Sequence, residues 1–394
     1  MGTTLVEDYL DLGLALGRHI DGLVDAYYGP REKAERVAAV PVRPPGQLVA
    51  QARRLLADLA ADGELDPVRR RFLSAQVEGL RTTAARLAGE KIGYADEVAA
   101  CYGVRPALVP EEAFAEAHER LASVLPGSGP LAERYIAWRE AQVVPVDKLD
   151  AAVQSLATDL RERTQRLWGL PDDEHIDFEL VSDKPWAGFN YYLGGLRSRV
   201  AINIDLPVLS PGLGHLVAHE AYPGHHTEHC RKEVGLVRKR NRLEETIFLV
   251  GTPQCLLAEG LADLGIEIAI GRRPEPVIAS HLRPLGIPYD AEVVATTSEA
   301  GEVLGAVRGN AALLLHDEGR DIDTVVDYVA RWGLMSRPRA EKAVQFIADP
   351  TWRAYIYCYI EGHALCRRFV AGDPARFERL ISEQLTPADL QEAA

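Results

Sequence analysis

The sequence is poor in cysteine and has no long apolar run. Its 394 residues include five cysteines, Cys101, Cys230, Cys255, Cys358 and Cys366, an odd number at irregular spacing and without a CxxC pair. This usage predicts reduced thiols and argues against a disulfide framework. No run of about eighteen apolar residues is present, so the sequence predicts no membrane span. The N-terminus also lacks the basic start of a secretory signal. We therefore expect a cytoplasmic protein.

Positive charge is scarce as well. The chain has 44 Lys and Arg against 58 Asp and Glu, which gives a net charge of −14. Proteins that bind nucleic acids usually carry a basic patch, and none stands out here, so we expect neither a nucleic-acid nor a membrane partner. The 47% of hydrophobic residues is ample for a large core. The composition leaves the oligomeric state open.

What the sequence does have is a cluster of histidines. Five of the eleven lie between His215 and His229. Within this stretch, His219 and Glu220 follow three apolar residues, which predicts a buried helix with a polar pair on one face. Zinc peptidases use His-Glu at the start of HExxH, in which two histidines one turn apart bind the metal and the Glu acts as general base. The cluster therefore points to a metal site.

The spacing in this stretch departs from HExxH. The fourth residue after His219 is Pro223, which cannot bind a metal and breaks a helix interior. His225 would lie about 240° round a straight helix, and His226 about 10 Å along it. We therefore predict that regular helix is interrupted after Ala221, by a bulge or a full irregular turn. We assign His225 as the second ligand and keep His226 as the alternative or as a supporting residue.

A third ligand is predicted on a later helical pattern, residues 243–271. Glu259 is flanked there by apolar residues, and a buried carboxylate needs a partner or a metal. Asp263 follows four residues later, about 40° away on the same face. We assign Glu259 to the metal and Asp263 to a hydrogen bond with a ligand histidine. The alternative is a pair of acids bonded to nearby arginines.

Strands are predicted just before the histidine cluster. Residues 176–181 alternate between apolar and polar, and residues 189–205 have the pattern of a hairpin around two glycines. In zinc peptidases an edge strand at this place pairs with an extended substrate. We assign Tyr192 and Asn203, on this hairpin, to substrate binding. The alternative is an ordinary antiparallel ribbon.

Two tyrosines are candidates for transition-state stabilisation. A final helix is predicted from Pro350, and Tyr355 and Tyr359 would lie one turn apart on it. Zinc peptidases commonly aim a tyrosine hydroxyl at the developing oxyanion. We assign this role to Tyr359, or else to Tyr355. The alternative is that both tyrosines only pack.

Most of the remaining chain has helical periodicity, beginning with a helix at residues 3–28. We predict a mostly α-helical fold with a small antiparallel ribbon or sheet. Residues 1–175 would form a helical scaffold domain, and residues 176–394 a metal-binding catalytic core. The two would be intimately packed, or form a single domain.

The motif His219–His226 resembles the HExxPGHH signature of the bacterial domain-of-unknown-function 885 family. Glu259–Ala262 is similar to that family's EGxA segment, and Tyr359–Gly362 to its YxxG. The resemblance covers roughly residues 185–370, and the eight-residue signature is its most specific part. It implies a distant relationship to gluzincin metallopeptidases, and thus a mostly helical fold with a zincin-like catalytic core.

These observations predict a zinc-dependent hydrolase with one Zn²⁺ per chain. His219, His225 and Glu259 would bind the metal, and a fourth position would remain for water, as in catalytic sites. Glu220 would act as the base in attack on a peptide or peptide-like amide. One alternative is a metal enzyme that acts on a small metabolite. Another is a non-catalytic zinc protein in which His226 or His229 is the fourth ligand.

Overall fold

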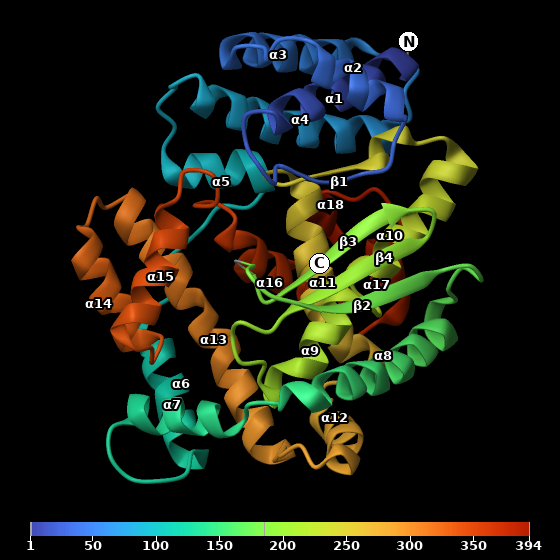
Figure 1. Ribbon diagram of the computed structural model, residues 1–394. Coiled ribbons are helices and arrows are strands. Elements are labelled where there is room, and N and C mark those ends of the chain that lie inside the picture. Colours follow the sequence, from blue (N-terminus) through green and yellow to red (C-terminus); the bar gives the residue numbers. More distant parts are fainter. Residues whose placement is uncertain (1, 185, 394) are drawn as a thin grey trace.

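The computed structural model describes residues 2–184 and 186–393. Its helices surround two small sheets (Figure 1), so the expectation of a mostly helical fold with a small sheet is confirmed. None of the described helices is both long enough and apolar enough to cross a bilayer.

The N-terminal helices form a layer at the top of Figure 1. Asp66 caps one of them by accepting a hydrogen bond from the Arg69 amide, and Pro67 follows at the position where a missing N–H has no cost. The apolar core of this layer also takes in Ile247 and Leu249 from the second half of the chain. The layer consists of α1 (Gly2–Gly17), α2 (Arg31–Ala39), α3 (Pro45–Ala61) and α4 (Pro67–Leu87).

Two short strands connect this layer to the rest of the molecule. The strands β1 (Val24–Tyr27) and β5 (Ile247–Leu249) pair in antiparallel fashion, whereas the sequence predicted helix at both places. The first helix ends at Gly17, and the chain turns again just before β1 at Gly22, whose φ of 79° is open mainly to glycine. At β5, tertiary pairing overrides the helical pattern of a segment that is fully buried.

The middle helices connect the two halves of the chain. Phe114 of α6 packs on Trp332 with ring centroids 5.8 Å apart, and α8 shares a core with Val217 and Ile278. The hydrophobic cores thus extend across residue 175, and the boundary there stays a prediction. These helices are α5 (Tyr94–Tyr102), α6 (Glu111–Val124), α7 (Leu131–Ala141) and α8 (Val146–Trp168).

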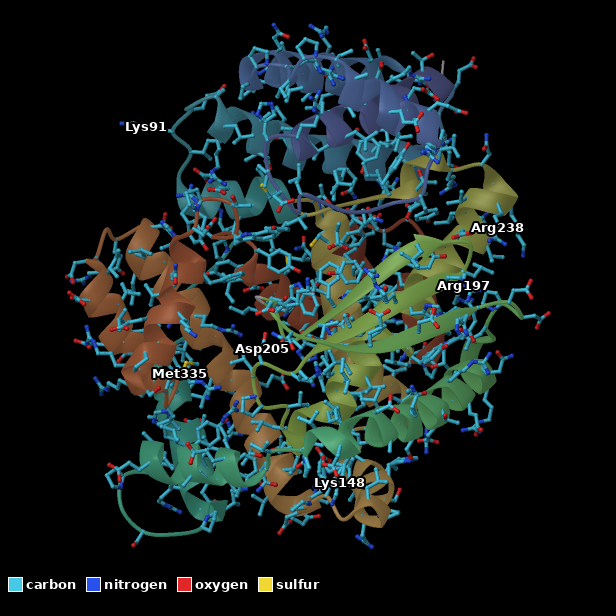
Figure 2. The ribbon with its side chains drawn as sticks, in the orientation of Figure 1. Lys91, Lys148, Arg197, Asp205, Arg238 and Met335 are labelled. Atoms are coloured by element: carbon cyan, nitrogen blue, oxygen red, sulfur yellow. The ribbon has the colours of Figure 1, made fainter. Side chains whose placement is uncertain are left out.

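The second sheet has the order β2-β4-β3 and lies beside the histidine stretch (Figure 1). The strands are β2 (His175–Val181), β3 (Gly188–Gly194) and β4 (Arg197–Asn203). The predicted hairpin is confirmed as β3 and β4, and β2 pairs in parallel with β4. Figure 2 labels Arg197 at one end of β4 and Asp205 just past the other. At the edge of this sheet, β3 contacts α9.

The helix α11 (Pro253–Ile270) runs through the centre of the molecule and is buried along most of its length. It packs against α9 (Ser210–Glu220), and α10 (His225–Lys232) follows α9 after a break. A π-helix, η1 (Glu233–Arg238), and a 3₁₀ turn, η2 (Leu243–Thr246), lead from α10 to β5. This arrangement brings the predicted metal-binding segments together.

The C-terminal half wraps around α11. The predicted helix from Pro350 is wrong in its first part, because residues 350–355 form turns and a π-helix, η4 (Cys358–Gly362), follows. A Cβ on Gly260 would lie 2.3 Å from the Gly362 carbonyl oxygen, so η4 approaches α11 more closely than larger residues allow. The other elements are α12 (Glu275–Leu282), η3 (Arg283–Leu285), α13 (Ala291–His316), α14 (Ile322–Trp332), α15 (Arg337–Ala348), α16 (His363–Val370), α17 (Pro374–Ser382) and α18 (Pro387–Ala393).

Candidate metal centre

Regular helix ends at Glu220 and resumes at His225, so the predicted interruption is confirmed as a full irregular turn. The Gly224 amide donates to the Ala218 carbonyl at 2.9 Å, which folds the chain back on α9. A Cβ at position 224 would lie 1.9 Å from the His219 carbonyl oxygen. Only glycine fits so close an approach, and it turns His225 back toward His219.

His219, His225 and Glu259 converge on one point. The Nε2 atoms of the two histidines are 3.1 Å apart. Glu259 places its Oε2 3.5 Å from the Nε2 of His219 and its Oε1 3.5 Å from the Nε2 of His225. The three ligating atoms come from α9, α10 and α11, and all three side chains are buried or nearly so. The structure therefore brings the three predicted ligands together.

The donor atoms at this point are better satisfied by a bound cation than by hydrogen bonds among themselves. Glu259 Oε2 is buried without a hydrogen-bond partner among the described residues. Such an atom is costly unless a charge or a donor satisfies it. Two imidazole nitrogens and one carboxylate are also the donor set of catalytic zinc sites. The unsatisfied oxygen and the choice of donors both agree with a bound zinc ion.

Asp263 holds His219 from behind. Its Oδ1 lies 2.8 Å from His219 Nδ1, and the Nε2 of His215 approaches the same oxygen to 3.5 Å. Burial opposes ionisation, but the hydrogen bond with His219 lowers the pKa of Asp263 to about 2. An ionised Asp263 keeps the proton on Nδ1, so Nε2 presents its lone pair to the site. This is the role predicted for Asp263.

Glu220 adjoins the cluster, and its side chain is buried. Burial raises its pKa to about 7, with Glu259 adding to the rise and His219 opposing it. Asn190 of β3 donates to the Glu220 backbone carbonyl at 2.6 Å. A Cβ on Gly188 would lie 3.3 Å from Glu220 Oε1, so the start of β3 runs directly alongside this carboxylate. Glu220 is thus held in place and free to take a proton.

The two candidate tyrosines differ in their contacts. Tyr355 donates from its hydroxyl to Glu259 Oε1 at 3.0 Å, which orients a predicted ligand. Tyr359 packs edge-on against the Tyr355 ring at 5.4 Å and is 36% exposed. Tyr359 is therefore the more exposed of the two, whereas the hydroxyl of Tyr355 is bonded to a predicted ligand.

His226 lies outside the cluster, although it follows His225 directly. Its Nδ1 is 2.8 Å from the Ser198 hydroxyl and its Nε2 is 2.9 Å from Glu174 Oε2. Both nitrogens are occupied, so His226 neither joins the three ligands nor hydrogen-bonds to them. The next candidate, His229, stacks on Tyr192 with centroids 4.6 Å apart. The structure thus offers neither histidine as a fourth ligand.

The two residues assigned to substrate binding are buried and hydrogen-bonded within the protein. Asn203 is buried and donates to the carbonyls of Lys184 and Trp186, both at 2.9 Å. Tyr192 is buried too, and its hydroxyl donates to Glu233 at 2.5 Å. The alternation of a strand places them correctly in the hairpin but does not say which partners its ends will find, so their roles in substrate binding stay predictions.

One acid near the site was missed from the sequence. Burial, together with the carboxylates of Glu259 and Glu220, raises the pKa of Asp25 to about 7. This shift places Asp25 of β1 close to the candidate centre. Residues 3–28 look helical in the sequence, and no local signal in them points to a strand that reaches a site more than 200 residues away.

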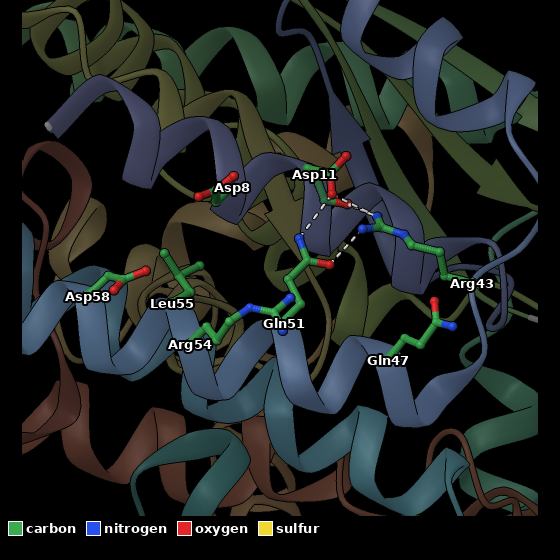
Figure 3. Close-up of a pocket in the computed structure, with 8 residues that line it drawn as sticks. All are labelled: Asp8, Asp11, Arg43, Gln47, Gln51, Arg54, Leu55 and Asp58. Carbon is green, nitrogen blue, oxygen red and sulfur yellow. Dashed lines mark hydrogen bonds and ion pairs between the residues drawn. The ribbon is translucent and has the colours of Figure 1, made fainter.

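A distinct cavity of about 350 Å³ lies between α1 and α3 (Figure 3). Part of its charged lining is paired, because Asp11 accepts hydrogen bonds from Arg43 at 2.7 Å and from Gln51 at 3.0 Å. None of the candidate site residues lines it. We therefore assign it no part in the chemistry.

No protein-family model and no curated protein matches the chain. Among solved structures it is similar to a candidate lipoprotein from Colwellia psychrerythraea, with 15% identity and a TM-score of 0.51 over 92% of this chain and 68% of that one. This likeness shows a shared fold and nothing further.

Two other solved structures are more distant. A candidate lipoprotein of unknown function from Shewanella oneidensis has 12% identity and a TM-score of 0.47, over 91% of this chain and 75% of that one. An M32 carboxypeptidase from Deinococcus radiodurans R1 has 14% identity and a TM-score of 0.41, over 100% of this chain and 94% of that one. Neither carries an argument about function, so the argument depends on the site itself.

Proposed function

We propose that this protein is a zinc-dependent hydrolase that cleaves peptide or peptide-like amide bonds. The observation that carries the proposal is the meeting of two imidazole nitrogens and a carboxylate with an unsatisfied buried oxygen, next to the buried side chain of Glu220. The likeness of the motif His219–His226 to the HExxPGHH signature supports the same chemistry. Three protein ligands leave a coordination position open, as in catalytic zinc sites.

His219, His225 and Glu259 would hold the zinc ion, and Asp263 would fix the tautomer of His219. When bound, zinc supplies Lewis-acid chemistry, which polarises a carbonyl group and acidifies water. Tyr355 orients Glu259 through its hydrogen bond at 3.0 Å. Together these contacts would determine where the reacting group lies relative to Glu220.

Glu220 takes the proton from the attacking water and passes it to the leaving nitrogen. A pKa of about 7 suits both steps, because the carboxylate can accept and release a proton near neutral pH. The hydroxyl of Tyr359 donates to the carbonyl oxygen as negative charge develops on it. The chain therefore supplies a base, an acid and an oxyanion donor.

The edge strand β3 supports an extended substrate. It pairs with β4 on one side, and no strand of the described residues joins its sheet on the other. Its start runs beside Glu220 at Gly188, where the absence of a side chain lets the strand lie close against α9. A peptide could add to this edge by backbone hydrogen bonds, and its scissile bond would then lie near Glu220.

We also propose that the protein works in a reducing compartment such as the cytoplasm, with neither nucleic acid nor membrane as a partner. The five cysteines are all free and buried. Burial raises the pKa of Cys101 to about 12, which keeps this thiol in its unreactive form. Activity that survives in strong reductant would support this.

Metal content and peptide turnover together test the proposed function. Protein purified without added metal should contain about one zinc per chain and cleave members of a peptide library. Glu259→Gln should weaken zinc binding and lower activity in proportion. Zinc without turnover of any peptide, but with turnover of a small metabolite, would favour a different metal enzyme. Zinc without any turnover would favour a structural metal.

A further inference from the structure

One face of α13 borders open space near the candidate centre. Gly301, Gly305 and Arg308 are four and seven residues apart, so they share one side of the helix. A Cβ built on Gly301 or Gly305 would meet no atom within 4 Å. This side of α13 is therefore not packed against a neighbour, and it carries a guanidinium group.

The adjacent side of the same helix packs on the segment that carries the candidate tyrosines. Tyr357 donates to the Gly309 carbonyl at 2.8 Å, and a Cβ on Gly309 would lie 2.7 Å from Ile360. Burial lowers the pKa of Arg308, and the charges of Tyr359 and Asp263 oppose this shift. Arg308 therefore lies within electrostatic reach of both Tyr359 and the acid behind His219.

Arg308 has no partner of its own. It is half-buried, yet its guanidinium makes no hydrogen bond or ion pair with any described residue. Arg367 on the nearby α16 shows the usual arrangement, since it bonds to Glu267 at 2.9 Å and also to Glu302. Buried charges are normally paired, because an unpaired one loses hydration without compensation. The fork of an arginine matches a carboxylate in two parallel hydrogen bonds.

We propose that Arg308 binds a carboxylate of the substrate, foremost the C-terminal carboxylate of a peptide. This inference deepens the proposed hydrolytic function, and it names the substrate class as amides that carry a free carboxylate beside the scissile bond. An acidic side chain offers the same chemistry from a second source. The carboxylate on Arg308 would anchor one end of the substrate while Glu220 and Tyr359 act on the amide.

Three related substrates and three variants test this. The substrates are benzoyl-glycyl-phenylalanine, its C-terminal amide, and benzoyl-glycyl-glutamic acid with its α-carboxyl amidated. We expect Arg308→Met to lower kcat/KM for the free acid by about 10- to 150-fold, mainly through KM, and to leave the first amide unchanged. Arg308→Lys should recover part of the loss. The control Arg367→Met removes a paired guanidinium and should leave kcat/KM unchanged for the free acid and for its amide.

The pattern across substrates decides the source of the carboxylate. Preference for the free acid over both amides, lost in Arg308→Met, supports a terminal carboxylate. Preference for the glutamic acid compound, lost in the same variant, supports a side-chain carboxylate on Arg308. Equal turnover of all three, or a preference that survives Arg308→Met, overturns the inference but leaves the hydrolase intact.

A binding measurement separates the inference from the proposed function. In Glu220→Gln, which should bind substrate without turning it over, calorimetry should show tighter binding of the free acid than of its amide. In Glu220→Gln/Arg308→Met the difference should vanish. If the native protein cleaves none of the compounds but this binding pattern holds, hydrolysis is wrong and the carboxylate site stands. If Glu220→Gln binds acid and amide equally, the carboxylate site is wrong.

Discussion

Two consecutive histidines begin α10, and they belong to two centres that differ in how fully the protein satisfies them. His226 has one ring nitrogen on Ser198 at 2.8 Å and the other on Glu174 at 2.9 Å. The Nε2 of His225 instead faces that of His219 at 3.1 Å, with Glu259 oxygens nearby. The same residue type, one position apart, is thus saturated in one centre and unsaturated in the other.

The carboxylates show the same contrast. Glu174 accepts from Tyr222 at 2.6 Å and from Arg161 at 2.6 Å, in addition to its bond with His226. Glu259 has one buried oxygen without a hydrogen-bond partner among the described residues. A buried polar group that the protein leaves unpaired is expensive, whereas a fully paired one stabilises the fold. We infer that the centre of His226 and Glu174 stabilises the fold, and that the centre of His219, His225 and Glu259 binds a ligand.

Replacing each of the two histidines separately should give the largest difference between the two centres. His225→Ala should lose zinc and all measurable hydrolysis but remain folded, because it removes a ligand. His226→Gln should keep zinc near one per chain and lose about 1–3 kcal/mol of stability, because Glu174 loses a partner. Elemental analysis and urea unfolding of both variants check this. Zinc kept in the first variant and lost in the second would reverse the assignment.

Replacing the base should separate chemistry from metal binding. Glu220→Gln has the same shape but cannot take a proton, so kcat should fall by about 10²- to 10⁴-fold while the zinc content is unchanged. Steady-state kinetics beside metal analysis provides the readout. Loss of the metal in this variant would mean that Glu220 is a ligand and not the base.

A smaller effect is expected behind the ligand His219. Asp263→Asn should weaken zinc affinity by about 10- to 100-fold, because the tautomer and orientation of His219 are no longer held. Competition with a chelator measures the affinity. Glu267→Gln, one turn further along α11 and bonded to Arg367, is the matched control and should leave affinity unchanged. Equal effects in both variants would remove Asp263 from the site.

The centre of His226 and Glu174 should make the stability of the protein depend on pH. Burial opposes ionisation of Glu174, but hydrogen bonds from His226 and Tyr222 lower its pKa from 4.5 to about 2. Stability from this carboxylate is therefore present above about pH 4.5 and lost as the pH falls toward 2. Glu174→Gln should be less stable than the native protein by about 1–3 kcal/mol at pH 7, with the gap narrowing in acid.

Urea unfolding at several pH values measures this gap, provided that zinc content is checked alongside. A gap that stays constant between pH 7 and pH 3 would show that the Glu174 carboxylate contributes nothing through its charge. A loss of zinc in Glu174→Gln would show that the two centres are not separate.

The sequence predicts this site better than it predicts the surroundings. Pro223 and Gly224 forbid a straight helix locally, so the break that brings His225 to His219 follows from the residues alone. Glu259 and Asp263 share a face at helical spacing, which their places near the two histidines bear out. Local rules suffice here because each constraint acts within one or two turns.

The strands β1 and β5 show what local rules miss. Val24–Tyr27 and Ile247–Leu249 pair across more than 200 residues, so neither segment reveals the other in its own pattern. The same holds for Asp25 on β1 and Arg308 on α13, which come near the centre only through tertiary packing. It also holds for Asn203 and Tyr192, whose partners lie on other segments.

The central claim is that a metal lies among His219, His225 and Glu259 and not at His226. A crystal structure of zinc-loaded protein, with anomalous diffraction at the zinc edge, tests it most directly. The account predicts one strong peak per chain, with both Nε2 atoms at about 2.0–2.1 Å and a Glu259 oxygen at about 2.0–2.2 Å. A peak bound by His226 and Glu174, or none at the three residues, would contradict it.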